Sequence, residues 1–338
     1  GRTGVITPVA CLKPVQLAGT LVSRASLHNA DEIKRKDIRI GDCVIVEKAG
    51  EIIPQVIEVV FSERKSNSQT FVFPSICPEC ESELYKVDGE TAWRCSNFIC
   101  PDQIKARIEY FASRGCMNID NLGESVISQL VDRSLATNLS DIYRLSKDEF
   151  LKLDGFGEKS AQNLFSSIEQ SKKQDLWRLI CGLGIKHVGV SASKELAREF
   201  RSLNVLVNAL EDDLTAIEGI GGIMAKSILL FFEIKENQEL ISFFENYGLQ
   251  VSLAEEDLNA DLPLTGEIFV LTGALSELTR DEAVLQIEAL GGRVSSSVSK
   301  KTSFLVSGSG TGSKFIKAQS LNIPIITETE FYNILKRE

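Results

Sequence analysis

Residues 77–100 read Cys77-Pro-Glu-Cys-Glu-Ser-Glu-Leu-Tyr-Lys-Val-Asp-Gly-Glu-Thr-Ala-Trp-Arg-Cys-Ser-Asn-Phe-Ile-Cys100, with cysteines in two close pairs. A tetrahedral structural zinc site takes four soft ligands, and a two-residue gap lets both thiolates of a pair converge from one turn. The four-residue gap of the second pair is a permitted variant. Because four cysteines leave no open coordination position, we predict one structural zinc ion per chain, held by Cys77, Cys80, Cys95 and Cys100.

The residues between the two cysteine pairs predict a hairpin over 85–93 with an Asp88-Gly89 turn, which is the usual arm of a zinc ribbon. This hairpin contains Lys86-Val-Asp-Gly89, which matches the K-x-D-G pattern around the nucleotide-accepting lysine of nucleotidyltransferases. Four residues are a weak match, and the tip of a ribbon has no pocket to desolvate a lysine. We therefore do not expect Lys86 to be catalytic.

The other four cysteines are scattered singly, which is typical of small buried hydrophobic residues in a reducing compartment. They are Cys11, Cys43, Cys116 and Cys181. No apolar run approaches the roughly 20 residues of a membrane helix, and Gly1-Arg-Thr-Gly4 lacks the layout of a signal peptide. These features predict a cytoplasmic protein without a membrane partner.

Residues 1–70 predict an OB-fold, a small nucleic-acid-binding barrel of five strands and one helix. Short β-rich runs cover 15–23, 43–48 and 52–61, and a capped helical turn is expected over 27–33. Tight turns are expected at Gly41-Asp42 and at 49–51. The polar residues 62–70 then lead into a zinc finger over 71–102.

Residues 103–250 predict an all-α domain of short helices interrupted by glycine. Four similar turns each precede a helix, at intervals of 34, 27 and 37 residues, and they are Asn121-Leu-Gly123, Gly155-Phe-Gly157, Gly182-Leu-Gly184 and Gly219-Ile-Gly221. Glycines let a ligand approach the backbone, and the following helix points free N–H groups at it, which suits a phosphate. This helix-hairpin-helix pattern predicts sequence-independent DNA contact at the glycines of the last three turns, with charge added by Lys159, Lys186 and Lys226. The first turn, with Asn121, is the one for which a purely structural role is the alternative.

The C-terminal region alternates strands and helices and predicts a small α/β domain with a parallel sheet over 263–338, after a linker over 251–262. Its expected strands are 267–272, 302–306 and 324–327, and its expected helices are 280–290, 314–320 and 328–335. The whole chain is thus predicted to be a multi-domain α+β protein.

The formal charge of −10 over 338 residues argues superficially against a nucleic-acid partner. Only residues 1–70 are net basic, with 10 Lys and Arg against 8 Asp and Glu. Phosphate contact depends on local patches and backbone N–H groups, which a total charge does not describe. The acidity lowers the expectation of DNA binding without excluding it.

These segments together resemble the C-terminal part of bacterial NAD-dependent DNA ligases over essentially all 338 residues. The most specific similarity lies in the OB segments Gly1–Ala10 and Ser23–Ile33, extended by Ile40-Gly-Asp42 and Ala49–Val56. The resemblance implies sealing of nicks during replication and repair: a lysine is adenylated from NAD, AMP passes to the 5′-phosphate, and the 3′-hydroxyl displaces it with help from magnesium.

In this family the adenylated lysine and the NAD-recognition domain precede the OB domain. The resemblance therefore implies that this chain clamps nicked duplex DNA as a monomer but does not seal it alone. Arg2 matches an OB-domain arginine at the junction with the nucleotidyltransferase domain, and it is the candidate for a residue near the chemistry. A surface charge of the barrel is the alternative.

The last domain resembles a BRCT domain through Phe269–Gly273, Leu290–Val294 and Gly312-Ser-Lys314. The tryptophan common in the last BRCT helix is absent, and Phe331 is expected in its place. In BRCT domains that bind phosphate, the residues matching Thr272, Gly273 and Lys314 form the pocket. A purely structural role or a protein partner is the alternative.

Two further functions compete with the ligase hypothesis. One is a non-catalytic DNA-binding repair adaptor that uses the hairpins and the BRCT domain, but an adaptor has no need of the OB segments. The other is a repair nuclease, for which no cluster of Asp, Glu or His spaced for two metals is evident. His28 and His187 are the two histidines, and each is expected to be a hydrogen-bonding residue.

Overall fold

The computed structural model describes residues 1–49, 53–253, 263–264, 266–273, 275–295, 297–308 and 312–335. The chain divides into two units, Gly1–Leu253 and Ala254–Glu338. The predicted linker over 251–262 lies mostly outside the described residues. None of the helices described here has the length and apolar character that a membrane crossing requires.

The first unit begins with a small β-sheet domain. Its sheet has the strand order β2-β3-β5-β4, formed by β2 (Val9–Leu17), β3 (Thr20–Ser26), β4 (Val44–Ala49) and β5 (Ile53–Val59). Helix α1 (Ala30–Arg35) follows β3, and the Asn29 side chain caps it by accepting a hydrogen bond from the Glu32 N–H at 2.9 Å. Ile33 on this helix is buried, as are Val22 and Val56 on the strands.

Two expectations for this domain were wrong. The predicted strand over 15–23 is a hairpin, because Ala18 and Gly19 both adopt positive φ, at 47° and 74°, and reverse the chain. Successive positive φ values form the tight hairpin turn that matches the twist of its strands. Among the described residues the sheet has four strands and not the five expected, and β1 (Val5–Ile6) pairs with the zinc ribbon.

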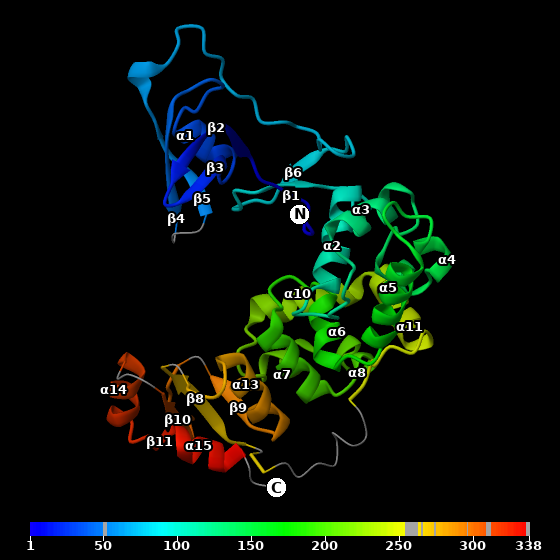
Figure 1. Ribbon diagram of the computed structural model, residues 1–338, viewed down its shortest axis with the longest axis vertical. Coiled ribbons are helices and arrows are strands. Elements are labelled where there is room, and N and C mark those ends of the chain that lie inside the picture. Colours follow the sequence, from blue (N-terminus) through cyan, green and yellow to red (C-terminus); the bar gives the residue numbers. More distant parts are fainter. Residues whose placement is uncertain are drawn as a thin grey trace. The chain divides into compact units, whose positions relative to one another are not determined.

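The zinc ribbon is a three-stranded sheet in the order β1-β7-β6. Its hairpin consists of β6 (Leu84–Lys86) and β7 (Trp93–Cys95), and Gly89 has a φ of 82° in the predicted Asp88-Gly89 turn. A long segment that includes the 3-10 helix η1 (Phe61–Glu63) leads from β5 to this ribbon (Figure 1). The N-terminal strand therefore belongs to the metal module and not to the sheet that follows it.

The helical region follows directly from the last cysteine of the ribbon (Figure 1). Its elements are α2 (Pro101–Ala112), α3 (Glu124–Asp132), η2 (Leu139–Tyr143), α4 (Lys147–Phe150), α5 (Glu158–Ser171), α6 (Leu176–Gly182), α7 (Val190–Phe200), α8 (Leu203–Val207), α9 (Glu211–Thr215), α10 (Gly222–Glu233) and α11 (Lys235–Asn246). One continuous hydrophobic core joins them from Ile104 to Val251. At its centre Phe111 stacks on Phe244 with ring centroids 5.8 Å apart.

The second unit is a parallel four-stranded sheet in the order β11-β10-β8-β9. The strands are β8 (Ile268–Thr272), β9 (Arg293–Ser295), β10 (Phe304–Ser307) and β11 (Ile325–Thr327). The helices are α13 (Arg280–Ala289), α14 (Ser313–Ser320) and α15 (Glu328–Leu335). Strand β9, directly after the Gly291-Gly292 turn, is the one that the sequence analysis did not predict.

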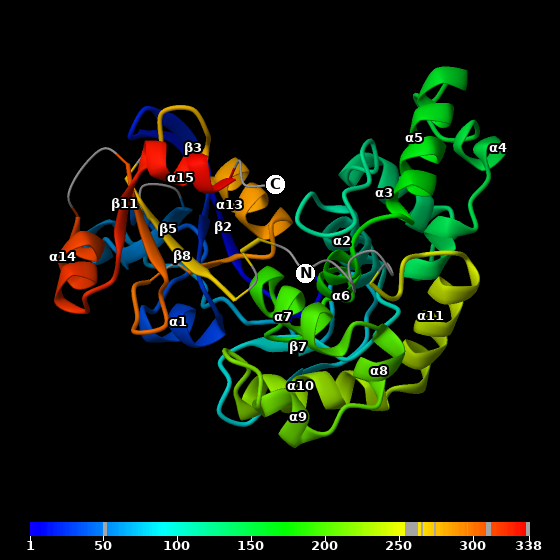
Figure 2. The same cartoon turned by 90° about the horizontal axis from the view of Figure 1, so that it is seen from below.

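Two small cores place the helices of this unit on opposite faces of its sheet. Ala283 of α13 and Phe331 of α15 share one core, whereas Ala318 of α14 belongs to the other. Figure 2 shows α14 across the sheet from α13 and α15. Phe331 is fully buried, in the last helix, where the sequence analysis expected it to replace a tryptophan.

Candidate functional site

The four cysteines predicted to bind zinc come together. Their Sγ atoms all lie within 4.8 Å of one another, and those of Cys80 and Cys95 are 3.5 Å apart. Zinc–sulfur bonds of about 2.3 Å in a tetrahedron place the sulfurs about 3.8 Å apart, so this donor set suits zinc. Burial raises the pKa of Cys100 to about 12, so metal binding there must displace a proton.

The four-cysteine cluster contacts both helix α2 and the N-terminal segment. Gln103, buried on α2, donates from its side chain to the carbonyl oxygens of Cys95 and Asn97, at 3.3 and 2.9 Å. Gly4 has a φ of 74°, and a Cβ there would lie 2.8 Å from the Cys95 oxygen. The cysteines, the N-terminal segment and the first helix therefore form one module, and the position of Gly4 requires glycine.

The helical region repeats one local structure four times. A residue with positive φ is followed by an apolar residue and then by a glycine that caps the next helix. These hairpins, numbered first to fourth, are Asn121-Leu122-Gly123 before α3, Gly155-Phe156-Gly157 before α5, His187-Val188-Gly189 before α7, and Gly219-Ile220-Gly221 before α10. Their capping glycines follow one another at intervals of 34, 32 and 32 residues. This spacing is more regular than the one read from the sequence.

The third hairpin lies five residues beyond the predicted turn. Gly182 is the last residue of α6 and is buried, and a Cβ there would lie 2.9 Å from the Phe111 ring. The positive-φ position belongs to His187, at 69°, a residue type that is enriched in this conformation. The expected Gly182-Leu-Gly184 hairpin is therefore wrong, because these glycines end a helix, and Gly189 is the residue that the sequence analysis missed.

The four capping glycines have no internal reason to be glycine. Their φ angles lie between −121° and −89°, which any residue adopts, and a Cβ at each would meet no atom within 4 Å. Serine or aspartate would cap these helices slightly better. The missing side chains thus leave open space in front of the free N–H groups, which is the arrangement that an approaching anion needs.

The first helical residue divides the hairpins into two pairs. The first and second begin with Glu124 and Glu158, whereas the first turns after the third and fourth hairpins contain no acidic residue. Lys226 near the fourth hairpin is exposed and makes no ion pair among the described residues, and Lys159 near the second is also exposed. Lys186 is paired with Glu90 of the zinc ribbon at 3.1 Å.

Arg2 lies against the helical region. Its guanidinium group donates to the Gly184 oxygen at 2.8 Å and lies 4.2 Å from the ring centroid of Tyr110 on α2. This contact joins the start of the chain to the segment between α6 and the third hairpin. Lys86 of the K-x-D-G match lies on strand β6, where its Nζ pairs with Asp31 at 2.9 Å.

The second unit brings together the residues expected to bind phosphate and one further cation. Lys314 at the start of α14 and Arg280 at the start of α13 both donate to the Leu271 oxygen at 3.4 Å, beside Thr272 at the end of β8. Burial, with a contribution from Arg280, lowers the pKa of Lys314. Sequence reasoning missed Arg280, because nothing in its local pattern shows that α13 begins beside this strand end.

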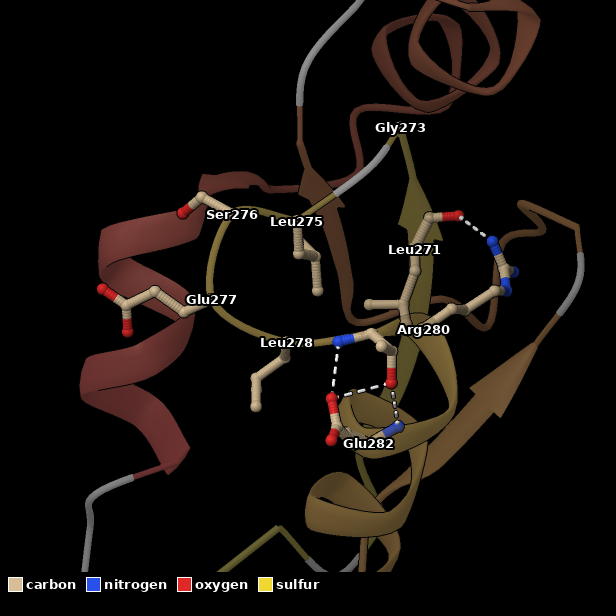
Figure 3. Close-up of a pocket in the computed structure, with 9 residues that line it drawn as sticks. Leu271, Gly273, Leu275, Ser276, Glu277, Leu278, Arg280 and Glu282 are labelled. Atoms are coloured by element: carbon tan, nitrogen blue, oxygen red, sulfur yellow. Dashed lines mark hydrogen bonds between the residues drawn. The ribbon is translucent and has the colours of Figure 1, made fainter.

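A pocket of about 390 Å³ adjoins this group (Figure 3). Leu275 and Leu278 line it, and Arg280 extends along its edge toward the Leu271 oxygen. Glu277 and Glu282 also line it. Glu282 is occupied by Thr279, whose N–H and hydroxyl both donate to its carboxylate at 2.7 Å. Apolar side chains and charged side chains of both signs therefore line the pocket together.

Four family models match the chain. They describe the NAD-dependent DNA ligase OB-fold domain at residues 1–68, the NAD-dependent DNA ligase C4 zinc finger domain at 77–101, a helix-hairpin-helix motif at 178–241 and a BRCT domain at 259–335. The zinc finger model covers the four cysteines, and the motif model covers the third and fourth hairpins.

Several curated proteins resemble the chain over its whole length. A DNA ligase of Carboxydothermus hydrogenoformans is 51% identical over 331 residues, which are 98% of this chain and 50% of that protein. A DNA ligase of Bacillus subtilis is 47% identical over 343 residues, covering 100% of this chain and 51% of the relative. The chain therefore spans about half the length of the curated relatives it matches.

Proposed function

Because the chain belongs to the NAD-dependent DNA ligase family and corresponds to the C-terminal part of these enzymes, we propose that it is the DNA-clamping portion of a nick-sealing enzyme. Its substrate is duplex DNA with a 3′-hydroxyl beside a 5′-phosphate. The observation that carries the proposal is the fourfold hairpin with its open capping glycines. Backbone N–H groups at helix starts bind phosphates without regard to base sequence.

The third and fourth hairpins make the main phosphate contacts in this proposal. Their helices begin without an acidic side chain, so the partial positive charge of each helix start stays available to a phosphate. Gly189, Gly221 and Lys226 are the residues proposed to contact the backbone. The first and second hairpins contribute chiefly to the fold, because a glutamate in the first turn of each helix places a negative charge near the helix start.

The zinc ion has a structural role. A four-cysteine set leaves no position for substrate, and the cluster joins the N-terminal strand to the first helix of the clamp through Gly4 and Gln103. Zinc would therefore hold the N-terminal strand and this helix in fixed positions relative to each other. The Lys186–Glu90 ion pair extends the same contact to the edge of the third hairpin.

NAD and magnesium are proposed as cofactors of the complete enzyme, bound mainly outside these 338 residues. Lys86 does not suit an adenylate acceptor, because it lies on an exposed ribbon hairpin and already pairs with Asp31. We therefore propose that the 338 residues alone bind nicks but do not seal them. Arg2 remains the proposed residue of this chain nearest to the chemistry, once released from Gly184.

We also propose that the rim of the second unit's pocket binds a phosphate group. Thr272 and Gly273 lie at the strand end where Lys314 and Arg280 converge. One carbonyl oxygen does not neutralise two positively charged side chains, so both can also bind an anion. Replacing Lys314 and Arg280 by glutamine would then weaken phosphate-dependent binding by this unit.

The proposal is tested with the zinc-loaded chain and fluorescent duplexes that differ only by a nick. We expect binding that falls steeply with salt and is indifferent to base sequence, with no sealing when NAD and magnesium are added. Salt-independent binding would contradict the phosphate clamp. Binding that is normal but never supports sealing after the upstream part of the enzyme is supplied would favour the repair adaptor instead.

A further inference from the structure

Two cysteines that zinc does not use lie side by side in the core of the helical region. The Sγ atoms of Cys116 and Cys181 are 3.4 Å apart, although 65 residues separate them in the chain. Cys116 belongs to the turn after α2, and Cys181 lies in α6. Both residues are only 1% exposed. A disulfide bond is about 2.05 Å long, so the two sulfurs must move closer together before they can join.

The surroundings make the two sulfurs unequal. The Tyr110 hydroxyl lies 3.4 Å from the Cys181 sulfur, and Arg2 covers the ring of the same tyrosine. The Cys116 thiol donates toward Cys181, which lowers the pKa of Cys181 and raises that of Cys116. Cys181 is therefore the member of the pair that more readily becomes the nucleophilic thiolate.

We propose that Cys116 and Cys181 form a reversible disulfide bond when the chain is exposed to hydrogen peroxide, and that this bond weakens DNA binding through the third hairpin. The Cys181 thiolate attacks one peroxide oxygen, which gives a sulfenic acid and releases water after proton uptake. The Cys116 sulfur then displaces the hydroxyl group as a second water. Two thiols are oxidised and one peroxide is reduced, and a dithiol such as dithiothreitol reverses the reaction.

The effect on DNA follows from the position of Cys181 and rests on the proposed function. The residue precedes Gly182, which packs so closely on the Phe111 ring that an added Cβ would lie 2.9 Å from it. A shift of α6 toward Cys116 is therefore passed on through Gly184 to the third hairpin. Arg2, bound to the Gly184 oxygen, would be displaced with it.

The bond itself is tested without DNA, in a variant with Cys11→Ser and Cys43→Ser so that exposed thiols do not link two chains. The zinc-loaded variant is treated with limiting peroxide, and free thiols are blocked with N-ethylmaleimide. The protein is then digested, and the peptide masses are measured by mass spectrometry. We expect a Cys116–Cys181 linked peptide that disappears with dithiothreitol and is absent from Cys116→Ser and Cys181→Ser. Zinc content measured on the same samples controls for loss of the metal. Recovery of both residues as blocked thiols, or oxidised without linkage, overturns the proposal.

The proposed effect of the disulfide on DNA binding is tested by titrating the chain with nicked duplex before and after oxidation. The affinity should fall by about threefold to tenfold, recover with dithiothreitol, and stay constant in peroxide-treated Cys116→Ser. An unchanged affinity in a sample with the linked peptide overturns this half of the proposal. If the reduced chain binds no DNA, the proposed function fails, whereas the peptide result still decides whether the disulfide forms.

Discussion

The first and second hairpins have the same backbone conformation as the third and fourth. They differ in the residue that begins the helix. All four have a positive-φ residue, a capping glycine and open space in front of it. Glu124 and Glu158 begin the first pair of helices, whereas Val190 and Gly222 begin the second pair. A glutamate there stabilises the helix by about 0.3–1 kcal/mol. Its negative charge also offsets the partial positive charge of the helix start, which would otherwise attract a phosphate. In the proposed clamp, this one side chain separates the hairpins that bind phosphate from those that serve the fold.

The largest effect is expected when the second pair is made to resemble the first. Val190→Glu with Gly222→Glu places a negative charge in front of both proposed DNA-contacting helices. The affinity for nicked duplex, measured by fluorescence anisotropy at low salt, should fall by about 100-fold. The midpoint of thermal unfolding should stay constant or rise, because glutamate favours a helix start.

The matched control is Val190→Gln with Gly222→Gln, which adds side chains of the same size without charge. It should lose much less affinity than the glutamate variant. Equal losses in both variants would mean that bulk and not charge matters at these positions. No loss in either variant would show that these hairpins do not contact DNA.

The comparison also shows what the sequence can predict about this chain. The zinc site was predictable because four cysteines close in the chain must converge, and most BRCT strands were predictable from alternating β and α patterns. The third hairpin was not, because its positive φ belongs to His187 and the nearby Gly182 and Gly184 ended a helix instead. A pattern of glycines reports conformational freedom, but it does not say which residue uses it.

Tertiary contacts set a second limit on prediction. Strand β1 lies within residues 1–70, which were predicted to form the OB-fold, yet it pairs with Trp93 and Arg94 of the ribbon. Arg280 reaches the Leu271 oxygen only because α13 begins beside the end of β8. Neither contact leaves a local signal, since each depends on where a distant segment lies.

A smaller effect is expected from the capping glycines themselves. Gly189→Ala with Gly221→Ala fills the open space in front of the second pair, and the affinity for nicked duplex should fall by about tenfold, since a phosphate must move back. Gly123→Ala with Gly157→Ala makes the same change in the first pair and should cost less than twofold. Both variants should lose similar stability in urea titrations. Equal affinity losses would remove the distinction between the pairs.

The lysines near the hairpins should differ more in salt dependence than in affinity. Lys226→Ala should weaken binding by about threefold and reduce the slope of log K against log salt by about one, because one phosphate contact is lost. Lys159→Ala, at an exposed position near the second hairpin, should leave the slope unchanged. The measurement is a series of anisotropy titrations between 50 and 200 mM salt. A lower slope for Lys159→Ala would place the second hairpin on the DNA as well.

The smallest effect comes from making the first pair resemble the second. Glu158→Gln removes the charge in front of α5 and frees Lys147, which pairs with Glu158 at 2.7 Å. If the second hairpin lies near DNA but its glutamate repels the phosphate, the affinity for nicked duplex should rise by about twofold, since an exposed charge near a phosphate contributes a few tenths of a kcal/mol.

The matched change Glu124→Gln tests the first hairpin, which lacks a lysine at the next position. A gain at Glu158 without one at Glu124 would rank the second hairpin closer to the duplex. A gain above tenfold at either position would mean that the glutamate normally faces a phosphate directly, and the division of the hairpins into two pairs would then be wrong.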